Sequence, residues 1–308
     1  MTRLIDRTTR GVYMVAATPF DQVGTVDHES LRRLCDFYLG HGVTGLTILG
    51  MMGEANKLTP EERKAVIDTV LDRVGDVPVI VGVSDAGLGN LAALSAYAMD
   101  RGAAGLMVAP VAGPAREDRI ETYFHSVCNA IGADAPLVFQ DFPLATGLPV
   151  SPALIRRLSN DQPQIVMLKH EDWPGLSKIS ALREIEKKPA VSRLSILVGN
   201  GGLYLPQELQ RGADGAMTGF AYPEALVQTV ALHMRGDVDA AEDLFDRYLP
   251  ILRHEQQPGF GLAVRKYILM KRGAISCDTT RAPGPLLTYR DKSEVDRLIA
   301  RLEMTLAG

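Results

Sequence analysis

A lysine and a glutamate stand two positions apart after an apolar run. Lys169 follows the run at 165–168, and Glu171 comes two residues later. Removal from water favours the neutral, nucleophilic form of an amine, which can then add to a carbonyl group and form a Schiff base. Side chains two apart on a strand point to the same side, so Glu171 is a candidate to transfer protons beside that amine. A buried structural ion pair between Lys169 and Glu171 or Asp172 is the other interpretation, and position alone does not separate the two.

Other polar residues close apolar runs elsewhere in the chain. Gln140 ends the run at 136–140 and Asp141 follows it, so both are candidates to orient hydroxyl groups of a substrate. Gly199 and Asn200 open a Gly-Asn-Gly-Gly stretch whose backbone N–H groups could face an anion. A plain loop is the more common role of such a stretch.

A turn with two glycines follows the run at 46–50. Its sequence is Gly50-Met51-Met52-Gly53-Glu54, and the glycines would allow backbone N–H groups near Met51 and Met52 to face a bound carboxylate. A tight turn without a ligand is again the more common outcome. We predict Lys169, Glu171 and Gln140 as catalytic residues and Met51, Met52, Asp141, Gly199 and Asn200 as substrate-binding residues.

An internal repeat indicates which elements position these residues. A Gly-x-x-Gly phrase precedes an apolar run at 42–45, 102–105 and 212–215. The first glycines are 60 and then 110 residues apart, which corresponds to about 28 residues per unit if two and four units intervene. That length suits one strand followed by one helix.

Eight short apolar runs fit this spacing as buried strands, with amphipathic helices between them. The runs lie at 12–18, 46–50, 77–83, 106–110, 136–140, 164–168, 194–199 and 216–220. We therefore predict an α/β fold, a (β/α)8 TIM barrel, in which reactive groups lie at the C-terminal ends of the strands. An open doubly wound sheet is the alternative, but no Gly-rich dinucleotide fingerprint follows the first run.

The chain continues beyond the eighth unit with further helical patterns. We predict a catalytic barrel at 1–236 and a C-terminal helical region at 237–308 that packs on it. The helices of this second region are expected at 237–255, 261–273 and 293–306.

Composition and charge narrow the function classes. The 308 residues are 46% hydrophobic and 23% charged, with 33 basic and 37 acidic residues and a net charge of −4. Without a basic run, a signal-peptide core or an apolar run of about 18 residues, we expect a cytoplasmic protein with no nucleic-acid or membrane partner. Cys35, Cys128 and Cys277 are widely spaced, which fits neither a disulfide framework nor a zinc site. The expected partner is a small molecule, and no cofactor or metal is predicted.

The motifs together resemble the dihydrodipicolinate synthase/N-acetylneuraminate lyase family of class I aldolases and dehydratases. The positions that carry the resemblance are Thr18-Pro19-Phe20, Gly45 to Glu54, Pro143, Thr146-Gly147, Lys169, Gly199 and the C-terminal helices. The resemblance implies that Lys169 forms a Schiff base with pyruvate or another 2-keto acid and that the turn at Met51 and Met52 receives the substrate carboxylate. It also implies a homotetramer.

The chain departs from the family pattern at the proton-relay positions. Met51 and Met52 replace two threonines, and Gln140 replaces a tyrosine, although an amide cannot exchange protons at neutral pH. A second relay tyrosine falls at Val111 or Ala112, and an arginine for an aldehyde substrate falls at Ala145. These departures argue against dihydrodipicolinate synthesis.

One branch of the family fits better, that of L-2-keto-3-deoxyarabonate dehydratase. The shared motifs are Gln140-Asp141-x-Pro143, Lys169-x-Glu171, Gly215 to Gly219 with Tyr222-Pro223, and Leu249-Pro250 with His254-Glu255. The resemblance implies a Schiff-base lyase that removes water from a 2-keto-3-deoxy sugar acid. A pyruvate-dependent aldolase uses the same imine and is the first alternative.

Two further alternatives come from other classes of function. A metal-dependent aldolase would use His170, Glu171 and Asp172, although adjacent residues on a strand point alternately and do not readily converge on one ion. A barrel that lost its relay residues would bind a keto acid without turning it over.

Overall fold

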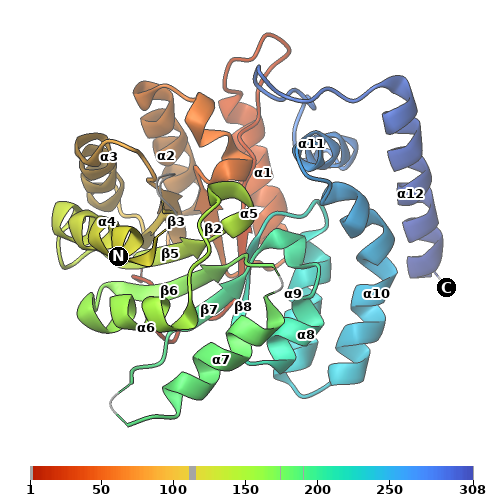
Figure 1. Ribbon diagram of the computed structural model, residues 1–308. Helices are drawn as coiled ribbons and strands as arrows, with labels where there is room; N and C mark the ends of the chain where they lie inside the picture. Colours follow the sequence, from red (N-terminus) through yellow and green to blue (C-terminus); the bar gives the residue numbers. More distant parts are fainter. Residues whose placement is uncertain (1–2, 111–115, 174, 190, 308) are drawn as a thin grey trace.

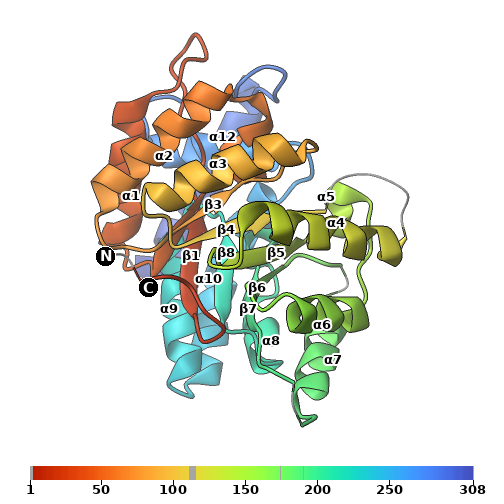
Figure 2. The same ribbon diagram turned by 90° about the vertical axis from the view of Figure 1, so that its left-hand side faces the viewer.

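The computed structural model describes residues 3–110, 116–173, 175–189 and 191–307. In this part of the chain, eight parallel strands pair in sequence order and β8 closes on β1, so the sheet is a barrel surrounded by helices (Figures 1 and 2). The predicted TIM barrel is confirmed. The strands are β1 (Gly11–Val15), β2 (Gly45–Ile48), β3 (Val79–Gly82), β4 (Gly105–Val108), β5 (Leu137–Asp141), β6 (Ile165–His170), β7 (Ser195–Val198) and β8 (Gly215–Thr218).

The strands separate two apolar layers because their side chains alternate. Tyr13 and Val15 of β1 face inward, whereas Val12 and Met14 pack against the surrounding helices. The interior cluster contains Ile5, Tyr13, Val15, Ile80, Ala104, Met107, Val138, Met167, Leu197 and Met217. The barrel is therefore a packed core, open to ligands only at its ends.

The helices that follow the strands begin at capping signals readable in the sequence. Asp27 accepts a hydrogen bond from the N–H of Ser30, and Thr59 forms a capping box with Glu62 in front of Pro60. These helices are α1 (His28–Gly40), α2 (Pro60–Val74), α3 (Leu88–Asp100), α4 (Glu117–Ile131), α5 (Pro143–Thr146), α6 (Pro152–Asp161), α7 (Leu176–Glu186), α8 (Leu205–Gln210) and α9 (Pro223–Met234). Short 3₁₀ turns are η1 (Met51–Gly53), η2 (Ala55–Lys57) and η3 (Asn200–Gly202).

Three helices follow the barrel in the described residues: α10 (Val238–Glu255), α11 (Gly261–Lys271) and α12 (Tyr289–Ala307). Helix α10 packs on α9, and α12 lies outside α10 at the edge of the molecule (Figure 1). Helix α12 begins four residues before its predicted start at 293. Side chains of α10 and α11 belong to the same apolar cluster as the outer face of the barrel, so a boundary at residue 236 remains a proposal.

All three cysteines are free, and Cys35 and Cys128 are buried. No helix in the described part of the chain has the length and apolar character needed to cross a membrane.

Candidate active site

Lys169 lies on β6 itself, because the strand extends two residues beyond the predicted run. It pairs in register with Gln140 of β5 and Leu197 of β7. Met167, two residues earlier, belongs to the interior cluster, so Lys169 also faces the barrel interior at its C-terminal end. Its side chain is buried, with 5% exposed.

The structure brings three of the predicted residues together, and we call them the Lys169 cluster. The Nζ of Lys169 lies 3.0 Å from the Oε2 of Glu171. The Nε2 of Gln140 donates a hydrogen bond of 2.7 Å to the same oxygen. All three side chains are buried. One carboxylate oxygen therefore meets an amine and an amide, which fix its position beside the amine.

The loop after β7 holds Glu171 from the other side. Asn200 donates from Nδ2 to the backbone carbonyl of Glu171 over 3.0 Å. Gly199 lies against the carboxylate side chain, where a Cβ would come within 2.2 Å of the Cγ of Glu171. Only glycine leaves this space free, so Gly199 and Asn200 position the acid.

The turn after β2 forms the wall of the same end of the barrel. Met52 packs against the interior cluster, while Met51 is 43% exposed. The N–H groups of Gly53 and Glu54 donate to carbonyls within the turn. Thr18, in the loop after β1, supports it by donating to the carbonyl of Gly53 over 2.6 Å. The first N–H groups of a 3₁₀ turn have no partner within it, and here they belong to Met51 and Met52.

Asp141 lies apart from the Lys169 cluster although it neighbours Gln140 on β5. Its buried carboxylate accepts a hydrogen bond of 2.7 Å from Lys178 of α7. Lys178 also contacts Asp172 over 2.5 Å, and His170 lies 3.7 Å from Asp141. Because strand neighbours alternate, Asp141 and His170 face the helix layer rather than the barrel interior.

The model of the dihydrodipicolinate synthetase family matches residues 8–302. The chain belongs to the dihydrodipicolinate synthetase family. Over 299 residues it is 30% identical to an L-2-keto-3-deoxyarabonate dehydratase from Azospirillum brasilense, covering 96% of this chain and 94% of that protein. This is a family of lyases.

Two solved structures of the family show the same architecture. The crystal structure of dihydrodipicolinate synthase from Rhodopseudomonas palustris is 45% identical and has a TM-score of 0.95, covering 97% of this chain and all of that one. A prophage protein of the dihydrodipicolinic acid synthase family from E. coli K12, in complex with pyruvate, is 26% identical and has a TM-score of 0.86, covering 96% and 98% of the two chains. The named relatives thus include a dehydratase and a synthase.

The structure describes Gln140 and Ala145, two of the positions that depart from the family pattern. Gln140, in place of the expected tyrosine, is inside the cluster as a hydrogen-bond donor. Ala145 lies on α5, a single helical turn after β5. Val111 and Ala112 lie outside the described residues.

Lys178 belongs to the surroundings of the site and was missed by reasoning from the sequence. It lies in the first turn of α7, where the helix dipole disfavours a basic side chain. That unfavourable place is a signal that acidic partners are near, and here they are Asp141 and Asp172. The sequence alone does not show that Lys178 lies near these two acids.

The metal-binding alternative is not favoured by the geometry around Lys169. Glu171 faces Lys169, Asp172 faces Lys178, and the Nε2 of His170 lies 3.1 Å from the carbonyl of Gly175. These side chains turn to separate partners and do not converge on one ion.

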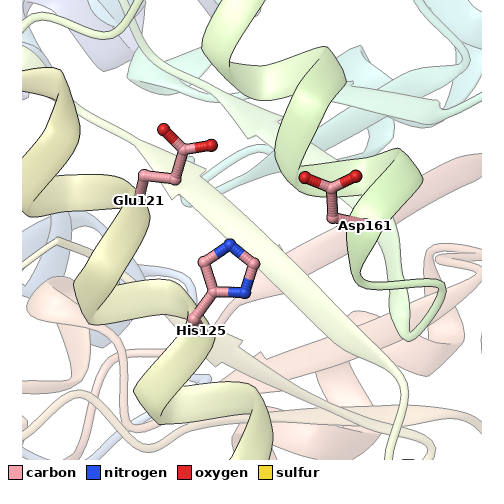
Figure 3. Close-up of side chains that lie close together, drawn as sticks. All are labelled: Glu121, His125 and Asp161. Atoms are coloured by element: carbon pink, nitrogen blue, oxygen red, sulfur yellow. The ribbon is translucent and has the colours of Figure 1, made fainter.

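A different group of side chains, on the outer helix layer, has the types that bind metals. Figure 3 shows Glu121 and His125 on α4 facing Asp161 of α6, and their ligand atoms lie within 4.8 Å of one another. His125 is already held by Gln162 at 2.7 Å, and Glu121 lies 3.4 Å from the cationic Arg157. This group contacts none of the Lys169 cluster, so we give it no part in the reaction.

Proposed function

We propose that the protein is a Schiff-base-forming lyase, a dehydratase that removes water from a 2-keto-3-deoxy sugar acid such as L-2-keto-3-deoxyarabonate. The observation that carries this proposal is the contact of 3.0 Å between Lys169 and Glu171. It supplies an amine for imine formation and an acid/base group beside it, without a tyrosine relay. The similarity to the Azospirillum brasilense dehydratase supports the same reaction class.

The first step in this proposal is imine formation at Lys169. The neutral amine attacks C2 of the substrate, and the carbonyl oxygen leaves as water. The imine takes up one proton from solvent, which hydrolysis later returns, and so becomes an iminium ion. The positive nitrogen withdraws electrons from C3 and makes its protons acidic. Because C3 is two bonds from the nitrogen, a carboxylate oxygen held about 3 Å from that nitrogen lies within reach of a C3 proton.

Glu171 then acts first as base and afterwards as acid. It takes the C3 proton to form an enamine, and it returns a proton to the C4 hydroxyl, which leaves as water. The new C3=C4 double bond shifts to C4=C5 as one proton leaves C5 and another adds to C3. The resulting enol tautomerises to the aldehyde, and water hydrolyses the imine to free Lys169. Hydrolysis of the imine consumes the one water that imine formation released. The net reaction is therefore loss of the single water from C4, which gives 2-oxoglutarate semialdehyde from the arabonate substrate.

Gln140 and the surrounding loops position Glu171 rather than exchange protons with it. The amide of Gln140 holds the Oε2 atom over 2.7 Å, and Asn200 holds the backbone carbonyl. For the substrate carboxylate we propose the N–H groups of Met51 and Met52, at a turn supported by Thr18. Asp141 is buried against Lys178, so we no longer propose it as a ligand for substrate hydroxyls.

The reaction class is tested by product analysis over a panel of 2-keto-3-deoxy sugar acids. A dehydratase releases a 2-oxo semialdehyde and no pyruvate. Free pyruvate with an aldehyde would instead assign the retro-aldol reaction of the same imine. Trapping of a keto acid on Lys169 without turnover of any panel member would support a non-catalytic binding protein.

We also propose that the protein is a cytoplasmic homotetramer. The three free cysteines support the cytoplasmic setting, and the family resemblance supports the tetramer. Sedimentation velocity at micromolar concentration tests the assembly: a tetramer supports it, and a monomer contradicts it.

A further inference from the structure

A pocket of about 210 Å³ lies between α7 and α8, beneath the loops that follow β6 and β7. The two helices lie side by side in the outer layer (Figure 1). Leu176 and Leu203 contribute apolar walls, and Gly199 and Asn200 separate the pocket from Glu171. No residue of the Lys169 cluster lines it. We call it the α7/α8 pocket.

A buried carboxyl group without a partner faces this pocket. Glu208 of α8 is 9% exposed and lines the pocket wall. Among the described residues, its side chain has neither a hydrogen bond nor an ion pair. Buried carboxyl groups are almost always paired, because an unpaired one is costly to remove from water. Burial accordingly raises the pKa of Glu208 to about 8.

Two aromatic rings stand at the same pocket. Trp173 and Tyr204 meet edge to face with ring centroids 5.2 Å apart. They are 43% and 46% exposed, so each ring presents surface that its own chain does not cover. Aromatic faces attract cations, tryptophan most strongly.

The charges around the pocket have the sign that attracts a cation. Asp172 is the second acid in its lining, and the lining residues in the described part of the chain include no lysine, arginine or histidine. Lys178 stands behind it, as a single positive charge between Asp172 and Asp141. One ammonium against two carboxylates leaves this side of the pocket net negative.

We propose that the α7/α8 pocket binds a small organic ammonium ion, with Glu208 as its counter-ion and Trp173 and Tyr204 as its aromatic walls. A water in the bulk liquid takes about 30 Å³, so the volume suits an ammonium group carrying a few methyl or methylene groups. The bound cation supplies the partner that the Glu208 carboxylate lacks. This inference is independent of the reaction at Lys169.

Choline is a suitable probe, and 3,3-dimethyl-1-butanol is its uncharged equivalent of the same shape. Trp173 is the only tryptophan in the chain, so its fluorescence reports on this pocket directly. The full-length protein, without substrate, is titrated with each compound at constant ionic strength. We expect a saturable change with choline and at least tenfold weaker binding of the alcohol. Glu208→Gln should weaken choline binding at least tenfold and leave pyruvate trapping on Lys169 intact.

Proton release on choline binding provides a second measurement. Below pH 8 the cation must displace a proton from Glu208, so choline affinity should rise about tenfold per pH unit up to pH 8 and then level off. Calorimetry in two buffers of different ionisation enthalpy measures the released proton. His170, Asp172, Lys178 and Tyr204 are the other ionisable side chains near the pocket, and the profile of Glu208→Gln measures their contribution.

The proposal is overturned by equal binding of choline and the alcohol, by no fluorescence response, or by release of no proton at pH 7. It is equally overturned if choline changes the sedimentation coefficient of the wild type and of Glu208→Gln alike. That result would show that subunit contact, and not cation binding, covers the pocket.

Discussion

At the residue scale, the proposed reaction depends on one carboxylate, Glu171, which we propose takes the place of a tyrosine relay. Glu171 contacts Lys169 and Gln140 through the same oxygen, so its position is fixed before substrate arrives. A base that is already in place avoids reorganisation when the C3 proton moves. This separates the proposed reaction from one that shuttles protons through hydroxyl groups.

Glu171→Gln should reduce kcat by about 10²-fold to 10⁴-fold, the usual contribution of a general acid/base. The amide keeps the size of the side chain but cannot exchange protons. Imine formation at Lys169 should survive, measured as the pyruvate adduct trapped by borohydride. Glu184→Gln, at an exposed position on α7, is the matched control. Retention of full kcat in Glu171→Gln would remove Glu171 from the mechanism.

Gly199→Ala should also lower kcat, through displacement of Glu171. A Cβ at this position would come within 2.2 Å of the Cγ of Glu171, so the carboxylate must move away from Lys169. Gly40→Ala is the control, because a Cβ at position 40 meets nothing within 4 Å. Steady-state kinetics and thermal unfolding of both variants separate activity from stability. Equal kcat for the two variants would contradict the positioning role.

At the element scale, the turn after β2 is joined to the C-terminal helices by buried charges. Glu54, in the left-handed conformation with φ 53°, contacts Lys266 of α11 over 2.6 Å and accepts from the N–H of Arg281 over 3.0 Å. Burial lowers the pKa of Lys266 to about 8. The turn that carries Met51 and Met52 is therefore held from below by Thr18 and from outside by α11.

Glu54→Gln should reduce the free energy of unfolding by about 3–5 kcal/mol, the usual cost of removing one partner of a buried pair. The Lys266 ammonium would remain buried without its counter-ion. Glu29→Gln breaks an exposed pair with Arg33 and should cost less than about 1 kcal/mol. Urea unfolding of both variants makes the comparison. A similar small loss for both would mean that the buried pair does not stabilise the turn.

Strands were predictable from the sequence because each is a short apolar run between turn residues, and Lys169, Glu171 and Gln140 were predictable because they end such runs. The side chains that surround these three residues were not predictable from the sequence. Asp141 directly follows Gln140 but occupies the opposite face of the strand, and its partner Lys178 is 37 residues away in the chain. The role of Glu54 depends on Lys266, 212 residues away. Pairings over such separations follow from the closed barrel, which no local pattern contains.

At the scale of the whole molecule, one buried group links stability to pH. Glu208 has a pKa of about 8 in the folded chain and an ordinary value near 4.5 when unfolded. Between these values only the folded state keeps the proton, so stability falls as pH rises from 4.5 to 8. The carboxyl group thus favours the folded state most at acidic pH.

Glu208→Gln should remove this dependence. The variant should match the wild type near pH 4.5 and exceed its stability at pH 8 by an amount on the order of 3 kcal/mol, since one pKa unit corresponds to about 1.4 kcal/mol and relaxation reduces the full effect. Urea unfolding at both pH values measures the difference. A constant difference between the two proteins across this range would contradict an unpaired buried Glu208.

The proposed reaction depends on a Schiff base between Lys169 and a 2-keto acid, and chemical trapping detects that bond. Pyruvate is a suitable probe because it is a small 2-keto acid. Borohydride added with pyruvate should increase the mass of the intact protein by one reduced pyruvate, and peptide mapping should place it on Lys169. The same treatment of Lys169→Arg should leave the mass unchanged. No mass gain in the wild type, or an adduct on another lysine, would contradict the account.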